Sequence, residues 1–234
     1  MKVIKGGREE LCRRIAGEIT MFVGNKPDCV LALSAAPDLM GVYAELVKSG
    51  TDFSRCLVFL TEEFTGVDED GQASRWKTMD RALLTPAHFS RWNVYVPAAR
   101  GKLDEECQAY DRMLEDAGGI DIALAAMGVN GHVAFNEPLT AFDSGTHAAR
   151  LTESTRREEW PGDFEDAPAM GTTVGIRSLM HARNAVMVGF GRQKAETARR
   201  TVAGVVHVSV PSSLMQMHEN VKVYLDHEAA SLLD

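Results

Sequence analysis

The sequence predicts an α/β protein in which one mostly parallel, doubly wound sheet carries helices on both faces. Short apolar runs of strand length alternate with longer stretches of helical periodicity along all 234 residues, an order typical of strand–helix–strand units. No internal repeat, low-complexity tract or interdomain linker interrupts this alternation. We therefore expect a single domain spanning residues 1–234.

The composition disfavours several classes of partner. The formal net charge of −8 argues against nucleic acid and anionic membranes, and no apolar run approaches the roughly 20 residues that cross a bilayer. The N-terminus turns polar at once, so we expect no signal peptide. The four cysteines form no CxxC pair, and no metal site is expected. These features are typical of a cytoplasmic protein with reduced, buried thiols.

Periodicity assigns the elements in chain order. Apolar side chains at spacings of three and four predict helices, and Pro37 near a start and Gly50 near an end support one of them. Helices are predicted over residues 9–23, 39–47, 76–84, 103–114, 191–202 and 212–217, and a turn with a short helix over residues 172–180. Short apolar runs predict strands over residues 29–33, 56–60, 93–96, 120–127, 185–190, 205–210 and 221–225. The polar, acidic stretch at 66–76 has no period and predicts a mobile surface loop.

The chemistry concentrates after the predicted strand at residues 120–127. The loop that follows, residues 128–138, brings Asn130, His132 and Glu137 within eight residues. In open α/β sheets, ligands bind just beyond the carboxyl ends of strands. A histidine with a carboxylate there can transfer protons near neutral pH, whereas a lone histidine more often only bonds to the backbone. The combination therefore indicates a catalytic site.

Three other strand ends bring polar groups to the same edge of the sheet. The small residues before Pro37 allow a phosphate to approach a helix N-terminus. Glu62 and Glu63 follow a predicted strand, and Lys194 lies at a strand-to-helix turn. Each signal is weak alone. A turn of small residues is commonly a plain connection, two adjacent acids commonly mark the start of a helix, and a lysine at such a turn is commonly exposed to solvent.

Several motifs resemble the glucosamine-6-phosphate deaminase (isomerase) family, which is related to the 6-phosphogluconolactonases. The resemblance is nearly residue for residue over residues 120–156, in the sequences GVNGHVAFNEP, FDSGTH and LTESTR. A weaker similarity extends over the whole chain and includes the turns at residues 31–37 and 191–194. It implies a doubly wound, Rossmann-like parallel sheet, in agreement with the prediction from periodicity.

The resemblance also implies a reaction and a set of roles. Enzymes of this family open, isomerise and deaminate a 2-amino-2-deoxy-hexose 6-phosphate, without cofactor or metal, to give fructose 6-phosphate and ammonia. By resemblance, His132 assists ring opening with Asn130 and Glu137, and Glu62 takes the C2 proton with Glu63 in support. We expect Glu137 to hydrogen-bond the imidazole and fix its tautomer.

The phosphate-binding region departs from the family pattern. By resemblance, substrate and phosphate are bound by Ser34, Ala35, Ala36, Glu63, Gly131 and Lys194. The family turn usually carries glycines and a second hydroxyl where this chain has alanines, which disfavour positive φ. The family arginine beyond the LTESTR motif is missing, and Arg156, Arg157 and Arg177 are the candidates to replace it. Lys194 is retained, which predicts that an anionic group is still bound.

The residue expected to act as the base also departs from the family pattern. The family has an aspartate where this chain has Glu62, so the acid is kept but its reach grows by one methylene. Because a misplacement of roughly 1 Å can cost about 100-fold in rate, we expect either an adjusted pocket or a different substrate, such as the galacto epimer.

Together these residues predict an aldose–ketose isomerase or deaminase that converts glucosamine or galactosamine 6-phosphate to a ketose 6-phosphate and ammonia. Two alternatives stay open: a 6-phosphogluconolactonase-like hydrolase, and a catalytically impaired sugar-phosphate-binding protein. The expected partner is a small-molecule sugar phosphate, and the oligomeric state cannot be read from the sequence. The isomerase or deaminase hypothesis requires one sugar-sized cavity that joins His132, Glu62 and Lys194.

Overall fold

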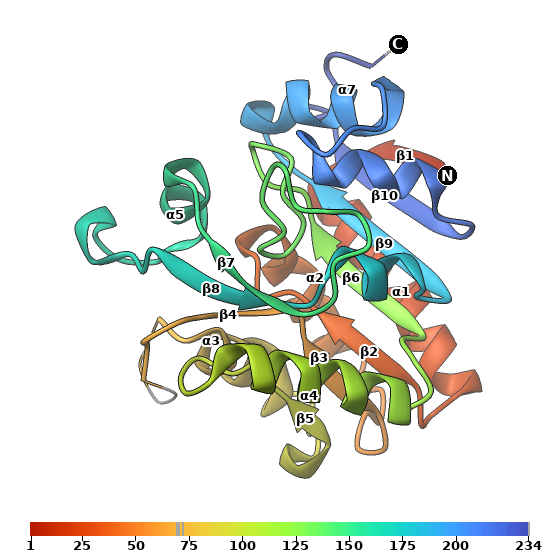
Figure 1. Cartoon of the computed structure of the whole chain (residues 1–234). Helices are drawn as coiled ribbons and strands as arrows, with labels where there is room; N and C mark the ends of the chain where they lie inside the picture. The colour runs from red at the N-terminus through yellow and green to blue at the C-terminus, as the bar shows by residue number, and fades with distance from the viewer. Residues whose placement is uncertain (69–70, 72, 234) are drawn as a thin grey trace.

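The computed structural model describes residues 1–68, 71 and 73–233, and at its centre lies a seven-stranded sheet (Figure 1). The strand order is β1-β10-β9-β6-β2-β3-β5, and every neighbouring pair is parallel. The strands are β1 (Lys2–Gly6), β2 (Val30–Leu33), β3 (Leu57–Leu60), β5 (Val94–Tyr95), β6 (Ile122–Ala126), β9 (Asn184–Gly189) and β10 (Val221–Asp226). The predicted fold class is confirmed.

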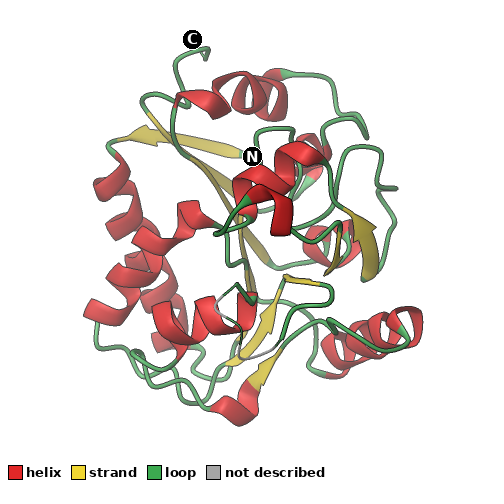
Figure 2. Ribbon diagram, turned by 90° about the vertical axis from the view of Figure 1, so that its left-hand side faces the viewer, coloured by secondary structure: helices red, strands yellow, loops and turns green. Residues whose placement is uncertain are grey.

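Helices cover both faces of this sheet (Figure 2). In β6, Ile122 and Leu124 enter one apolar core, whereas Ala123 and Ala125 enter another on the opposite face, as the two-residue period of a strand requires. The helices are α1 (Arg8–Asn25), α2 (Met40–Lys48), α3 (Arg75–Met79), α4 (Leu103–Asp116), α5 (Glu153–Glu159), α6 (Ile176–Met180) and α7 (Ala195–Ala203). The first core contains residues of α1 and α2, and the second contains residues of α4 and α7.

Short helical segments complete the chain. A π-helical segment, η2 (Asp80–Leu84), continues from α3. The 3₁₀ segments are η1 (Pro37–Leu39), η3 (Arg91–Asn93), η4 (Phe164–Asp166), η5 (Arg192–Lys194) and η6 (Pro211–Met217). In the described part of the chain, no helix combines the length and apolar character that crossing a membrane requires. All four cysteines are buried, as predicted, and none is in a disulfide.

The strand order reverses between β2 and β6. From β2 the chain continues outward to β3 and β5, whereas from β6 it continues to β9 and β10 on the other side. Connections that leave two adjacent strands in opposite directions open a crevice at the strands' carboxyl ends. The turn after β2 and the loop at residues 128–138 after β6 both lie there.

A small antiparallel sheet, β4-β8-β7, was not predicted. It consists of β4 (Glu62–Phe64), β8 (Met170–Thr173) and β7 (His147–Arg150). Strands of three or four residues are too short to show a reliable alternation. This sheet places α5, which follows β7, to one side of the main sheet (Figure 1).

Two predictions from periodicity were wrong in part. Residues 205–210 form turns rather than a strand, and Val205 is 85% exposed; the edge of the sheet beside β10 is instead occupied by β1. The stretch at 66–76 is not a surface loop throughout, because Ser74, Arg75 and Trp76 are buried. Residues 69–70 and 72 of that stretch lie outside the described residues.

Candidate active site

Two glycines shape the loop after β6 so that His132 is held inside it. A Cβ at Gly128 would lie 2.0 Å from Cε1 of His132, so only glycine lets the imidazole lie against this backbone. Gly131 has a φ of 90°, a conformation that favours glycine. Its carbonyl accepts the Ser212 N–H at 2.9 Å, and its own N–H donates to the Gly128 carbonyl. The N–H of Gly131, a predicted substrate contact, is therefore already used within the loop.

The three predicted ring-opening residues form a relay. The Asn130 Oδ1 atom lies 2.8 Å from His132 Nδ1, and the Asn130 Nδ2 atom donates to Glu137 Oε2 at 2.8 Å. Glu137 also accepts the Thr152 N–H at 2.9 Å. The hydrogen bond expected between Glu137 and the imidazole is thus replaced by one that passes through Asn130. Because Asn130 presents its oxygen to the ring, Nδ1 must carry a proton, and the tautomer is fixed as expected.

Glu62 is buried at the carboxyl end of β3. Its Oε1 accepts the Ser34 hydroxyl at 2.9 Å and the Ala35 N–H at 2.8 Å, and its Oε2 accepts the Thr61 hydroxyl. Burial raises the pKa of Glu62, and the charge of Arg75 offsets this only in part. The N–H of Ala36 donates to the Ser34 hydroxyl at 3.2 Å. The predicted phosphate turn therefore directs its donors to Glu62 and to itself.

Glu63 is a positioning residue for the segment that follows. Its carboxylate accepts the N–H groups of Arg75 and Trp76 and the Ser74 hydroxyl at 2.9–3.0 Å, and so anchors the start of α3. The Arg75 side chain lies over the Phe64 ring, 4.6 Å from its centroid. The Nε of Arg75 is buried without an acceptor among the described residues, a donor that a ligand hydroxyl could satisfy.

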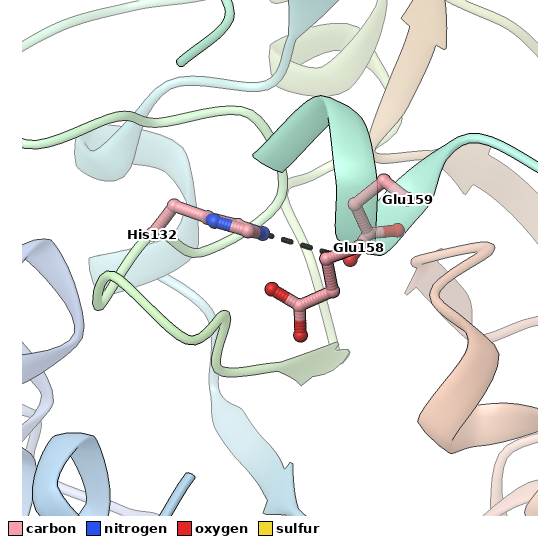
Figure 3. Close-up of side chains that lie close together, drawn as sticks. All are labelled: His132, Glu158 and Glu159. Atoms are coloured by element: carbon pink, nitrogen blue, oxygen red, sulfur yellow. Dashed lines mark ion pairs between the residues drawn. The ribbon is translucent and has the colours of Figure 1, made fainter. Parts of the chain in front are cut away.

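Arg75 and Glu159 form a buried ion pair that connects the two predicted catalytic groups. Arg75 donates to Glu159 Oε2 at 2.8 Å and to the Ala35 carbonyl at 3.2 Å. The other oxygen of Glu159 lies 3.6 Å from Nε2 of His132 (Figure 3). The predicted facing of His132 and Glu62 is therefore indirect: a chain of contacts runs from Glu62 through Ala35, Arg75 and Glu159 to the imidazole.

This arrangement shifts the protonation of the imidazole. Burial alone lowers the pKa of His132, but the hydrogen bond and charge of Glu159 outweigh it, and the pKa is raised. Burial likewise opposes the ionised form of Glu159, but Arg75 and His132 hold its pKa at about 2. The Glu159 carboxylate thus favours the protonated form of the imidazole, from the side of the nitrogen that would face a substrate.

Lys194 is buried and its ammonium is fully coordinated. Its Nζ lies 2.9 Å from Asp38 Oδ2, 2.8 Å from Glu158 Oε1 and 2.8 Å from the Met127 carbonyl. Burial lowers the pKa of Lys194, but the two carboxylates outweigh it and raise it. The predicted anion-binding lysine is thus in place, with its charge already neutralised from within the protein.

A cavity of about 540 Å³ opens beside Lys194. It is lined by Pro37, Asp38, Val129, Ser154, Arg157, Glu158, Gln193 and Lys194. Glu62 and His132 are not among these lining residues, so this cavity is not the single cavity expected from the sequence, which would join both of them to Lys194. Glu158 lines the cavity, and the next residue, Glu159, contacts His132 (Figure 3).

One of the three candidate arginines reaches this cavity. Arg157 lines it, although its guanidinium also pairs with Glu153 at 2.8 Å. Arg156 instead donates to the Ala167 carbonyl, and Arg177 pairs with Asp111 at 3.3 Å in another part of the molecule.

One cluster has the composition of a metal site. Ligand atoms of His132, Glu158 and Glu159 lie within 4.8 Å of one another (Figure 3). Lys194 and Arg75 already neutralise the two carboxylates. A divalent cation would therefore have to displace both ion pairs, and we assign no metal here.

Sequence reasoning missed Arg75, Glu158 and Glu159. Neither glutamate lies in a predicted helix or strand, and Arg75 lies in the stretch that was predicted to be a surface loop. A usable signal was the Thr152 N-cap, whose side chain accepts the Thr155 N–H. A helix starting there places Thr155 and Glu159 on one face, four residues apart, and both are buried.

Comparisons with known proteins agree with this geometry. The sequence model of the family described as glucosamine-6-phosphate isomerases/6-phosphogluconolactonase matches residues 7–224. A glucosamine-6-phosphate deaminase of Clostridium botulinum strain Hall is 30% identical, over 99% of this chain and 98% of the relative. One from Thermoanaerobacter sp. strain X514 is 31% identical, over 99% and 94%.

Solved structures extend the comparison to three dimensions. A structure described as a monomeric glucosamine-6-phosphate deaminase superposes with a TM-score of 0.95 at 29% identity, over 99% of this chain and 100% of the other. The 6-phosphogluconolactonase of Trypanosoma brucei gives 0.79 at 16% identity, over 100% and 98%, a likeness of fold alone. With its sequence matched almost end to end and its histidine loop at the switch point of the sheet, the chain belongs to the glucosamine-6-phosphate isomerase/6-phosphogluconolactonase family.

Proposed function

We propose that this protein is an enzyme that converts an amino-sugar 6-phosphate, glucosamine or galactosamine 6-phosphate, to a ketose 6-phosphate and ammonia. The observation that carries the proposal is the relay from Glu137 through Asn130 to His132 at the switch point of the sheet. The names of the relatives that match the chain end to end support the same reaction. A single domain spanning residues 1–234 and a cytoplasmic location are part of the proposal.

His132 serves the first step, ring opening, in which a proton moves between the sugar's O1 and O5. An imidazole suits this task because its pKa lies near neutrality. With Nδ1–H held by Asn130, Nε2 is the nitrogen that exchanges protons with the sugar. In the resting protein Glu159 faces that nitrogen, so substrate binding has to displace the Glu159 carboxylate.

Glu62 serves the second step, removal of the C2 proton from the open-chain sugar. A base works best when its pKa approaches the working pH, and burial raises that of Glu62 in this direction. Among the described residues, its Oε2 accepts the Thr61 hydroxyl alone, whereas Oε1 accepts two donors. Oε2 therefore keeps a lone pair for the proton. Return of that proton to C1 gives an imine at C2, and addition of water to C2 with loss of ammonia completes the conversion to the ketose.

A small panel of substrates tests the proposal. The purified protein is incubated with glucosamine 6-phosphate, galactosamine 6-phosphate and 6-phosphogluconolactone, and ammonia and ketose phosphate are measured. We expect equal amounts of both products from at least one amino sugar. Lactone hydrolysis without ammonia release would establish the hydrolase alternative, and saturable binding without turnover would establish the binding-only alternative.

Glu62→Gln isolates the proposed base. The amide can still accept from Ser34 and Ala35 but cannot take a proton, so C2-proton exchange should fall by about 100-fold or more while substrate binding is retained. The measurement is deuterium incorporation at C2 by NMR in heavy water. Exchange at the unaltered rate would exclude Glu62 as the base. Glu153→Gln, on the exposed face of α5, is the matched control.

A further inference from the structure

The strongest unassigned feature is an anion position that the protein fills with its own side chain. The ammonium of Lys194 and the backbone N–H of Val129 converge on the carboxylate of Glu158, at 2.8 Å from Oε1 and 2.9 Å to Oε2 respectively. Two donors from separate loops of the main sheet thus bind the two oxygens of one carboxylate. Charge-assisted hydrogen bonds of this kind are those that bind phosphate and carboxylate ligands.

Lys194 has no donor left for a ligand while Glu158 is in place. An ammonium has three N–H groups, and these are taken by Asp38, Glu158 and the Met127 carbonyl. Two carboxylates therefore surround one ammonium. A doubly charged phosphate brought to this position would meet excess negative charge rather than an available cation.

Of these two carboxylates, Glu158 is the one that can leave. Asp38 also accepts the Phe190 N–H at 3.2 Å and lies in η1 beside the main sheet. Glu158 comes from α5, which follows β7 of the small antiparallel sheet, and like Asp38 it lines the 540 Å³ cavity. The donors are held by the main sheet, whereas the acceptor is carried by a peripheral helix.

We propose that Glu158 is a specificity-determining residue: its carboxylate occupies the phosphate position between Lys194 and Val129 and must be displaced by the phosphate of the substrate. The identity of the substrate rests on the proposed function, whereas the internal competition for an anion does not. The protein's affinity for phosphate is then reduced by the fraction of molecules in which Glu158 has withdrawn.

Displacement of Glu158 from Lys194 also affects the His132 imidazole. Glu158 and Glu159 are consecutive residues at the end of α5, and Glu159 covers Nε2 of His132 at 3.6 Å. A phosphate that moves Glu158 away from Lys194 therefore also pulls on the residue that covers the imidazole. A sugar without the phosphate lacks the group that would start this displacement.

Glu158→Gln tests the proposal directly. Inorganic phosphate is titrated into the whole protein by calorimetry at fixed ionic strength. If Glu158 is withdrawn in about a tenth of the molecules or fewer, the variant should bind phosphate at least about tenfold more tightly than the wild type. Glu105→Gln on α4, an exposed glutamate that pairs with Lys102 outside this cavity, should leave phosphate affinity unchanged. Lys194→Met added to Glu158→Gln should abolish the gain.

Phosphate affinity equal to or weaker than that of the wild type in Glu158→Gln would overturn the proposal. Should that variant fail to fold, Glu158→Asp takes its place, because a side chain one methylene shorter cannot reach both Lys194 and Val129. It should still bind phosphate more tightly than the wild type, and an unchanged affinity would count against the proposal in the same way.

Kinetics separate this inference from the proposed function. In an active enzyme, Glu158→Gln should lower the KM for the amino-sugar 6-phosphate at least severalfold without lowering that for the unphosphorylated amino sugar. An equal change for both sugars would contradict the inference while leaving the deaminase function intact. A protein with no turnover contradicts the function, and the phosphate titration still decides the inference.

Discussion

Asn130 connects the His132 imidazole to the protein because its amide has two unlike ends. The oxygen faces His132 Nδ1 and the nitrogen faces Glu137, Thr152 and Thr155. A carboxylate at Glu137 can only accept, so it holds the NH₂ end of Asn130 toward itself. The direction of the whole relay therefore depends on the ionised state of one buried glutamate.

Glu137→Gln should disrupt this relay without changing its shape. The new amide has one oxygen, so it cannot accept from both the Asn130 NH₂ and the Thr152 N–H as the carboxylate does. Where its NH₂ faces Asn130, the Asn130 oxygen is no longer held toward the ring. We expect the closed-ring substrate to be converted about 100-fold more slowly, whereas C2-proton exchange on an open-chain analogue should change little. Parallel rate measurements on both substrates check this, and equal losses on the two would remove Glu137 from ring opening.

Glu159 governs the charge of His132. The pKa of Glu159 lies at about 2 instead of 4.5, and that of His132 is raised above 6.5. A lowered acid pKa stabilises the fold above 4.5, and this stability is lost as pH falls toward 2. A raised histidine pKa stabilises the fold below 6.5, and this stability is lost as pH rises through the raised value. The pair therefore stabilises the protein most between about pH 4.5 and 6.5.

Glu159→Gln should lower the pKa of His132. The neutral amide can still accept from Arg75 but no longer favours an imidazolium beside it. NMR titration of the His132 ring measures the effect, with Glu153→Gln as the control on the same helix. A ring that titrates at the same pH in the variant and the wild type would show that Glu159 is not the cause of the raised pKa.

At the scale of elements, α5 is held to the site from both ends. Thr152 caps its start and accepts from Asn130, while Glu159 at its end pairs with Arg75. This helix has only seven residues, too few to be stable alone. Its position therefore depends on these buried contacts, which link it to α3 and to the loop after β6.

A double-mutant cycle measures how strongly the buried pair holds α5. Arg75→Met removes the guanidinium that pairs with the buried Glu159 carboxylate at 2.8 Å and should lower the free energy of unfolding by about 3–5 kcal/mol. Arg75→Met with Glu159→Leu removes both charges and should recover most of that loss. Glu153→Gln breaks an exposed pair and should cost about 0–1 kcal/mol. Urea denaturation gives all three values, and a double variant no more stable than Arg75→Met would contradict the model of one coupled pair.

The elements that were predicted correctly are those with many apolar positions. The helix at α1 and the strands β2, β6 and β9 bury enough periodic side chains to be recognised from local pattern. The failures are short or partly apolar. Residues 205–210 carry valines but pair with no strand, and β7 and β8 bury few apolar residues. In these segments the presence or absence of a neighbouring strand to pair with, rather than the β-propensity of the residues, decided the structure.

For the whole molecule, a buried structural anchor and the proposed active site lie at opposite edges of the sheet. Asp121, at the start of β6, is 1% exposed and accepts the Val30 N–H at 2.8 Å and the Lys26 ammonium at 2.6 Å. It joins the amino ends of the two strands whose carboxyl ends carry the site. The length of the parallel strands thus separates this structural anchor from the loops that carry the proposed site.

Asp121→Ala should lower the stability of the protein without lowering its activity. The buried Val30 N–H loses its acceptor, which costs about 1–3 kcal/mol, while the catalytic loops keep their contacts. Thermal unfolding should show a lower Tm, and kcat/KM measured well below that temperature should match the wild type. A large loss of kcat/KM in a folded variant would mean that the two edges are coupled.

The sequence by itself determined the parallel sheet and the order of its elements, because apolar periodicity records which faces are buried. It also predicted that Asn130, His132 and Glu137 lie close together, because all three lie in one short loop whose glycines constrain its shape. Only the tertiary structure decided what surrounds them. Lys194 looks like a free cation in sequence, yet Asp38 and Glu158 neutralise it from more than 30 residues away. The meaning of a charge depends on its partner, and no local pattern specifies which distant side chain packs against it.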